Sequence, residues 1–270
     1  MNGLPYYVEQ GSGDVAVLLL HGVGGGHHAF DATLPVLASA GYRAIAWDAP
    51  GYGASRIQEP CSMTLFANAL QQLISHINAP RLVVLGHSMG GMIAQEALAR
   101  GVQAIDGLVL FATSAAFGKP GGEWQQEFLK SRFATLDTGL GMAGLAPVLV
   151  GSMLALGATA SVRAAAVNMM SLVPESVYRA ALAAIVTFNR LQALPNISVP
   201  TLCLACDGDK TAPPEALKKM AETIPLGQYG CIAQAGHLGN MEQPAAFNAI
   251  VLAFLKQHFS PTRSAVRASP

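Results

Sequence analysis

Short runs of consecutive apolar residues alternate along the chain with longer segments whose apolar residues recur at helical spacing. Continuous aliphatic runs of five or six residues are typical of strands that are buried on both faces. The alternation therefore predicts an α/β fold with a mostly parallel, doubly wound sheet. The expected strands are 6–9 at an edge, 15–20, 43–47, 81–85, 107–111, 200–205 and 228–232, and the expected helices are 31–40, 64–77, 91–100, 215–222 and 245–258.

The alternation stops in the middle of the chain. Residues 118–190 are rich in glycine and alanine and predict four helices, near 123–132, 143–156, 161–170 and 175–187. We interpret this segment as a helical cap, inserted into an α/β core that is formed by residues 1–117 and 191–259. Residues 260–270 are expected to be a disordered tail. Methionines and aromatic residues in the cap favour a substrate that is largely apolar.

Composition narrows the classes of function. Among 270 residues the formal net charge is zero and only 12% are charged, so nothing predicts a nucleic-acid partner. So few charges leave apolar surface exposed, either around a substrate pocket or at an interface between copies in a homo-oligomer. No run of about eighteen apolar residues predicts a membrane span, and no signal peptide is apparent.

The four cysteines indicate a reducing compartment. Cys203 and Cys206 are three residues apart in an expected strand, so they should face opposite sides and bind no metal together. Buried free thiols are typical of cytoplasmic proteins, which is the location we expect. We predict no metal ion and no organic cofactor.

A Gly-x-Ser-x-Gly pattern stands between an expected strand and an expected helix. In Gly86-His87-Ser88-Met89-Gly90, the two glycines permit a sharp turn with Ser88 at its tip. A serine at the start of a helix lies where developing negative charge is favoured. Ser88 is therefore the candidate nucleophile.

A nucleophilic serine needs a base, and the base needs a carboxylate that orients it. His237 follows the last expected strand and is the best placed of the downstream histidines. Asp209 and Asp207 both follow the preceding strand, and we favour Asp209 because it lies farther beyond the strand end. The sequence thus predicts a Ser88, His237 and Asp209 triad, with Asp207 as the alternative acid.

Acyl transfer also requires backbone N–H groups that stabilise an oxyanion. The candidates are Met89, directly after the nucleophile, and Val23, in the glycine-rich loop that follows the strand 15–20. Side chains expected to line the substrate pocket are His28, Trp124, Met142, Met153 and Leu238. Arg132, Arg163 or Arg179 of the cap would have to face inward if the substrate carried a carboxylate.

These motifs resemble the α/β-hydrolase superfamily over nearly all of residues 6–259. The resemblance rests on His21-Gly22-Val23-Gly24, on the segment 48–55, on Gly86-His87-Ser88-Met89-Gly90, on Asp209 and on Gly236-His237. It implies a serine hydrolase that cleaves carboxylic esters or lactones without a cofactor. Ser88 separates the chain from haloalkane dehalogenases and epoxide hydrolases, whose nucleophile is an aspartate.

Within the superfamily, residues 236–244 resemble the C-terminal motif of 3-oxoadipate enol-lactonases. The cap differs, because Gly151-Ser152-Met153-Leu154 stands where such lactonases tend to carry a Trp-Phe pair, which leaves the lactone open. Two alternatives remain. One is a carbon–carbon hydrolase of vinylogous diketones, although that branch often carries Asn and Trp where this chain has His87 and Leu238. The other is a non-catalytic binding protein, which would usually have lost part of the triad.

Overall fold

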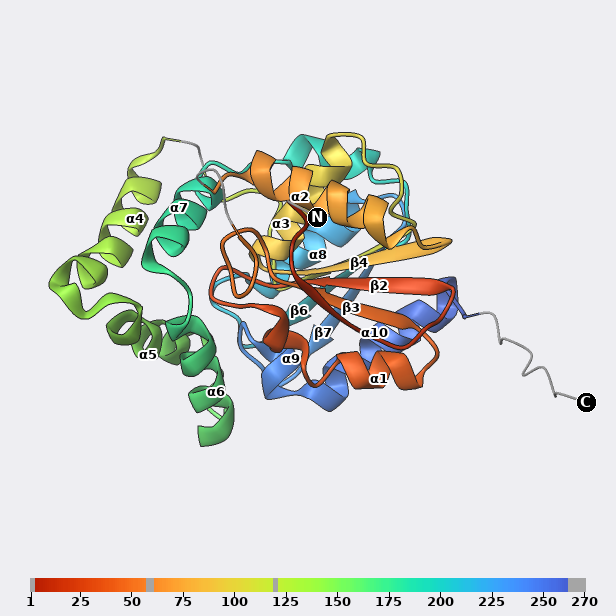
Figure 1. Ribbon diagram of the computed structural model, residues 1–270. Coiled ribbons are helices and arrows are strands. Elements are labelled where there is room, and N and C mark those ends of the chain that lie inside the picture. Colours follow the sequence, from red (N-terminus) through yellow and green to blue (C-terminus); the bar gives the residue numbers. More distant parts are fainter. Residues whose placement is uncertain (1–2, 57–60, 119–120, 262–270) are drawn as a thin grey trace, which may run out of the picture.

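A seven-stranded sheet forms the centre of the molecule in the computed structural model, which describes residues 3–56, 61–118 and 121–261 (Figure 1). The strand order is β1-β3-β2-β4-β5-β6-β7. β1 pairs antiparallel with β3, and all other neighbouring strands are parallel. The strands are β1 (Tyr7–Gln10), β2 (Val15–Leu20), β3 (Arg43–Trp47), β4 (Arg81–His87), β5 (Gly107–Phe111), β6 (Thr201–Cys206) and β7 (Gly227–Ile232).

Helices cover both faces of this sheet (Figure 1). Side chains of successive strand residues point to opposite faces, so Leu18 of β2 packs into one core layer and Leu19 into the other. The first layer includes α2 (Met63–Ile77), α3 (Met89–Ala99) and α8 (Pro214–Thr223), and the second includes α1 (Leu34–Ser39) and α10 (Pro244–His258). Two short helices, η1 (His27–Phe30) and α9 (Gly239–Glu242), lie in the loops after β2 and β7.

Four helices lie between β5 and β6, in the segment that the sequence predicts as a cap. They stand beside the sheet as a separate group (Figure 1). They are α4 (Glu123–Thr135), α5 (Gly141–Met153), α6 (Ala160–Ser171) and α7 (Glu175–Ile185), with η2 (Leu136–Leu140) between the first two and η3 (Leu191–Asn196) after the last. Where the cap leaves and rejoins the core, Phe117 N–H donates to Phe188 O at 2.9 Å and Arg190 N–H donates to Ala115 O at 2.7 Å.

One stretch of the described chain, Glu123–Met153, is long and apolar enough to cross a membrane by length and composition alone. It contains no run of eighteen apolar residues, since charged residues such as Lys130, Arg132 and Asp137 interrupt it, so the sequence-based expectation stands. The stretch is not one continuous helix, because Gly139 has φ +83° and separates α4 from α5. A helix that spans a membrane needs about 20 residues, whereas α4 and α5 have 13 residues each. The bend therefore favours two short cap helices over a span.

Most predicted elements agree with the structure to within a few residues. The helix predicted over 31–40 is shorter than expected: residues 31–33 form a turn after η1, and α1 begins at Leu34. Cys203 and Cys206 are buried in different core layers, as their spacing predicts, whereas Cys231 is exposed rather than buried. Of the predicted tail, residues 262–270 lie outside the described residues, as do 57–60 and the cap residues 119–120.

Candidate active site

Ser88 sits at a sharp turn between β4 and α3. Its φ of +52° and ψ of −116° lie in a region that residues with a side chain rarely adopt. The turn brings Gly90 so close to β2 that a Cβ on Gly90 would lie 2.2 Å from the backbone oxygen of Leu20, so a residue with a side chain does not fit there. Thr113 Oγ1 donates to Ser88 O at 2.7 Å, and Ser88 N–H donates to Phe111 O at 2.9 Å, so the end of β5 holds the turn in place.

The three residues of the predicted triad lie together. The Ser88 hydroxyl and His237 Nε2 are 3.0 Å apart, and His237 Nδ1 is 2.7 Å from Asp209 Oδ2. Asp209 and His237 are both buried, at 3% exposure each. Asp209 Oδ1 accepts the N–H groups of Thr211 and Ala212, which keeps Oδ2 directed at the histidine. A carboxylate on Nδ1 leaves Nε2 free to accept the serine proton.

Asp207, the alternative acid, is directed elsewhere. Its Oδ1 accepts the backbone N–H of Ala235 at 3.3 Å. It therefore supports the loop that carries His237, while Asp209 contacts the imidazole. Of the two candidate acids, Asp209 is the one in contact with His237, and its role as the acid stays a prediction.

Two backbone N–H groups are placed near Ser88. Met89 is the first residue of α3, and the N–H groups of a first helical turn have no carbonyl partner within the helix. Val23 lies in the loop after β2 and lines the same cavity as Ser88. That loop packs closely, since a Cβ on Gly22 would lie 3.2 Å from the Ser88 Cβ. Val23 and Met89 thus both lie next to Ser88 in the fold, and their role as oxyanion donors stays a prediction.

Two buried neutral histidines support this arrangement. His87 Nε2 donates to the carbonyl oxygen of His237 at 2.8 Å, and burial lowers the pKa of His87 to about 3. His21 Nδ1 donates to Gly22 O at 2.8 Å, while its Nε2 accepts the N–H of Ala49 at 3.0 Å. Burial lowers the pKa of His21 to about 4. One histidine thus fixes the His237 loop and the other fixes the loop of Val23.

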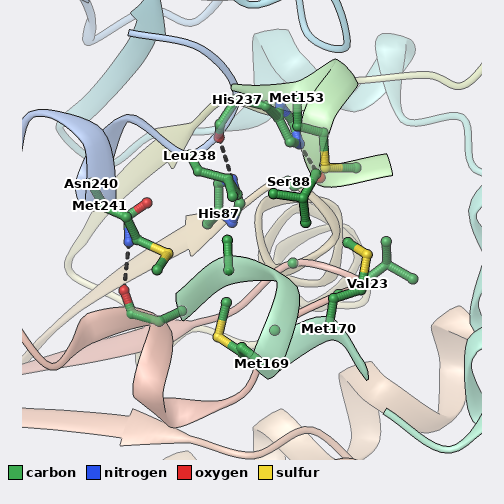
Figure 2. Close-up of a pocket in the computed structure, with 16 residues that line it drawn as sticks. Val23, His87, Ser88, Met153, Met169, Met170, His237, Leu238, Asn240 and Met241 are labelled. Atoms are coloured by element: carbon green, nitrogen blue, oxygen red, sulfur yellow. Dashed lines mark hydrogen bonds between the residues drawn. The ribbon is translucent and has the colours of Figure 1, made fainter. Parts of the chain in front are cut away.

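A cavity opens beside Ser88, and Figure 2 shows methionine side chains around it. It holds about 450 Å³ of atom-free space, including its mouth. Its apolar lining includes Met153 of α5, Met169 and Met170 of α6, and Leu238 and Met241 beside the histidine. Among the described residues that line it, none is Lys, Arg, Asp or Glu.

Three of the predicted pocket residues lie elsewhere. Trp124 is 59% exposed and stacks with Phe128 at a ring separation of 5.6 Å. Met142 is buried in the cap at the start of α5, and the His28 side chain is 67% exposed beside Asp31. Met153 and Leu238 do line the cavity. Helical spacing identifies an apolar face but not the neighbour that it packs against: Met142 packs within the cap, and Trp124 stays largely at the surface.

None of the three cap arginines lines the cavity either. Arg179 pairs with Glu175 at 2.8 Å and with Asp137 at 2.6 Å, and Arg132 lies over the ring of Phe128. Among the residues that the structure describes, none would therefore place a Lys or Arg side chain beside a substrate carboxylate in the cavity.

Sequence reasoning gave no role to Glu242 and Asn240. Asn240 lines the cavity and its Nδ2 donates to Ala29 O at 2.6 Å, which ties α9 to η1. Glu242 accepts backbone N–H groups from Gly236 and from Ala155 of the cap. The partner in the cap is 87 positions away in sequence, so the only available signal was the position of Glu242 within the motif 236–244.

A family model described as "alpha/beta hydrolase fold" matches residues 15–244, which contain all three residues of the triad geometry. The chain belongs to the α/β-hydrolase fold family. The match agrees with the resemblance seen in the motifs, and it spans both the core strands and the inserted cap.

The chain is similar to curated proteins and solved structures that are named for different activities. A Mycobacterium tuberculosis protein named "Putative non-heme bromoperoxidase BpoC" is 28% identical over 92% of this chain and 96% of its own. The solved structure of an esterase from Thermogutta terrifontis is 28% identical with a TM-score of 0.84, covering 94% of this chain and 93% of the esterase. An enol-lactonase from Burkholderia xenovorans LB400 has a TM-score of 0.82 over 93% and 96% of the two chains, and its 23% identity shows a common fold only.

Proposed function

We propose that this α/β hydrolase is a serine hydrolase that cleaves a small, uncharged carboxylic ester or lactone through an acyl-enzyme. The observation that carries the proposal is the continuous contact from Asp209 through His237 to Ser88 at the wall of an apolar cavity. Each atom in that chain of contacts is at the distance and in the order that nucleophilic catalysis by serine requires.

The proposed reaction has two halves. The Ser88 oxygen attacks the substrate carbonyl while His237 Nε2 takes the hydroxyl proton, and the N–H groups of Val23 and Met89 stabilise the oxyanion. When the tetrahedral intermediate collapses, His237 gives its proton to the leaving alcohol. Water then repeats the sequence on the acyl-enzyme and releases the acid. For a lactone the leaving alcohol stays joined to the acyl group.

The cavity supports the choice of substrate. Its narrow apolar space fits a short acyl group, and the methionines that line it adapt readily to apolar shapes. A substrate carboxylate would be desolvated there with no Lys or Arg among the described lining residues to pair with it, which is unfavourable. This favours neutral esters and lactones over an enol-lactone that bears carboxylates. The esterase relative adds support at the level of the family.

A substrate panel tests the proposal. It comprises p-nitrophenyl esters of increasing acyl length, neutral lactones, the same lactones bearing a carboxylate, and a vinylogous diketone dienoate, each with and without chelator. We expect kcat/KM to be highest for short neutral esters or lactones and to be unchanged by chelator. Turnover of the dienoate alone would indicate the carbon–carbon hydrolase alternative. Loss of turnover with chelator that metal restores would contradict the mechanism, and no turnover of any kind would favour a binding protein.

A further inference from the structure

Glu242 contacts the core and the cap at the same time. It is the last residue of α9, five positions after His237. Its Oε1 accepts the N–H of Gly236 at 2.9 Å, and its Oε2 accepts the N–H of Ala155, just beyond α5, at 2.7 Å. We call this pair of contacts the Glu242 bridge. Both oxygens of one carboxylate are used, one on each side of the boundary between core and cap.

The two backbone segments that the bridge joins are also in direct contact. His237 N–H donates to Met153 O at 2.7 Å, at the end of α5. A Cβ on Gly236 would lie 2.2 Å from the same Met153 oxygen, so a side chain at that position would force the segments apart. The backbone of the candidate base and the end of a cap helix thus share one hydrogen-bonded joint. The Met153 side chain at this joint lines the cavity.

A carboxylate suits this joint better than an amide. Two N–H donors face the side chain, and only a carboxylate offers an acceptor on both of its terminal atoms. Glutamine at the same position would turn its NH₂ group toward one of the two donors and leave that donor without a partner. An unpaired buried N–H is unfavourable, so the joint would loosen on one side. Burial raises the pKa of Glu242, with a smaller contribution from the nearby charge of Asp209, while the backbone N–H groups of Ala155, Gly236 and Leu238 favour its ionised form.

We propose that Glu242 is a positioning residue, which holds the loop of His237 against the end of α5 so that the placement of the cap sets the geometry of the base. The catalytic part of this inference rests on the proposed function. His237 Nε2 is 3.0 Å from the Ser88 hydroxyl, and a displacement of about 1 Å at such a contact can cost about 100-fold in rate. The bridge then acts on the chemical step, through the base, more than on substrate binding.

The variant Glu242→Gln tests this with almost no change in shape. We expect kcat, and the rate at which a fluorophosphonate labels Ser88, to fall together by about 10- to 100-fold. KM should change by less than about threefold, because the lining of the cavity is retained. The matched control is Glu222→Gln, the same chemical change at an exposed position of α8, outside the site and away from the cap. It should leave kcat within about threefold of wild type.

Amide hydrogen exchange gives a readout that does not depend on catalysis. In Glu242→Gln, the amides of Gly236 and Ala155 should both exchange faster than in wild type, while those of β4 should be unchanged. Unchanged kcat, or a rise in KM alone, would overturn the inference. If the wild-type protein neither turns over any substrate of the panel nor is labelled at Ser88, the proposed function fails. The bridge is then judged by exchange alone: faster exchange at both amides in Glu242→Gln would support the Glu242 bridge, and unchanged exchange would overturn it.

Chemical rescue adds a second variant. Glu242→Ala removes the carboxylate and leaves both N–H groups open, and formate carries two oxygens in the same arrangement. Adding formate should restore at least about tenfold of the lost kcat, and should also restore slow exchange at Gly236 and Ala155. Chloride at equal ionic strength serves as the control. Equal recovery with chloride, or no recovery with formate, would show that the effect of the substitution is not the loss of this bridge.

Discussion

At the scale of single residues, the two aspartates near His237 differ sharply in what they touch. Asp209 contacts the imidazole at 2.7 Å, whereas Asp207 accepts the backbone N–H of Ala235. Asp209→Asn would place an NH₂ group against Nδ1 and favour the tautomer that carries its proton on Nε2. We expect kcat to fall about 10³- to 10⁴-fold. Steady-state kinetics of Asp209→Asn beside Asp207→Asn check this, and equal losses would contradict the assignment of the acid.

The three candidate triad residues could be chosen from the sequence because each of them follows the end of an expected strand. Parallel strands carry their C-terminal ends to one edge of the sheet, so Ser88, Asp209 and His237 were expected there. The bridge by Glu242 could not be predicted in the same way. Its contact with Ala155 depends on how the cap docks, and that is decided by packing across the whole interface rather than by a local pattern.

At the scale of elements, the turn between β4 and α3 depends on the absence of a side chain at Gly90. A Cβ there would lie 2.2 Å from the backbone oxygen of Leu20, and backbone atoms yield less easily than a flexible side chain. We expect Gly90→Ala to lower the free energy of unfolding by about 1–3 kcal/mol or more. The control is Gly157→Ala, where nothing lies within 4 Å of the added Cβ.

Urea denaturation measures both glycine variants. The control should change the free energy of unfolding by less than about 0.5 kcal/mol, the usual range for a surface substitution. If Gly90→Ala were as stable as Gly157→Ala, the β4–α3 turn would not be the constrained element that its geometry indicates.

The cap shows where prediction at the element scale stops. The sequence predicts all four of its helices, but it does not predict which residues of each helix line the cavity. Met169 and Met170 of α6 line the cavity, whereas Met142 of α5 is buried within the cap. Spacing defines the apolar face of a helix, but that face can pack against a neighbouring helix, the core or the cavity, and the spacing alone does not say which.

At the scale of the whole molecule, two buried histidines make stability depend on pH. The pKa of His87 is lowered to about 3 and that of His21 to about 4, against 6.5 for the unfolded chain. The unfolded state therefore binds more protons below pH 6.5. The stabilising contribution is complete above pH 6.5 and is lost as the pH falls toward 4. Each histidine should cost up to about 1.4 kcal/mol per pH unit across that window.

Urea denaturation at pH 7, 6, 5 and 4.5 measures this dependence. The variant His87→Asn should reduce the slope of unfolding free energy against pH by up to about one proton, because one buried neutral histidine is removed. The exposed residue His76 provides the control, and His76→Asn should leave the slope unchanged. A slope that is the same in all three proteins would contradict the assignment of His87 as a buried neutral group.

The central claim for the whole molecule is that Ser88 is the nucleophile of a serine hydrolase. The most direct measurement is labelling by a fluorophosphonate, with the modified residue located by peptide mass spectrometry, in wild type and in Ser88→Ala. We predict that wild type is labelled at Ser88 alone and that Ser88→Ala stays unlabelled, folds normally and loses at least about 10³-fold of its esterase or lactonase turnover. Full turnover by unlabelled Ser88→Ala would contradict the account.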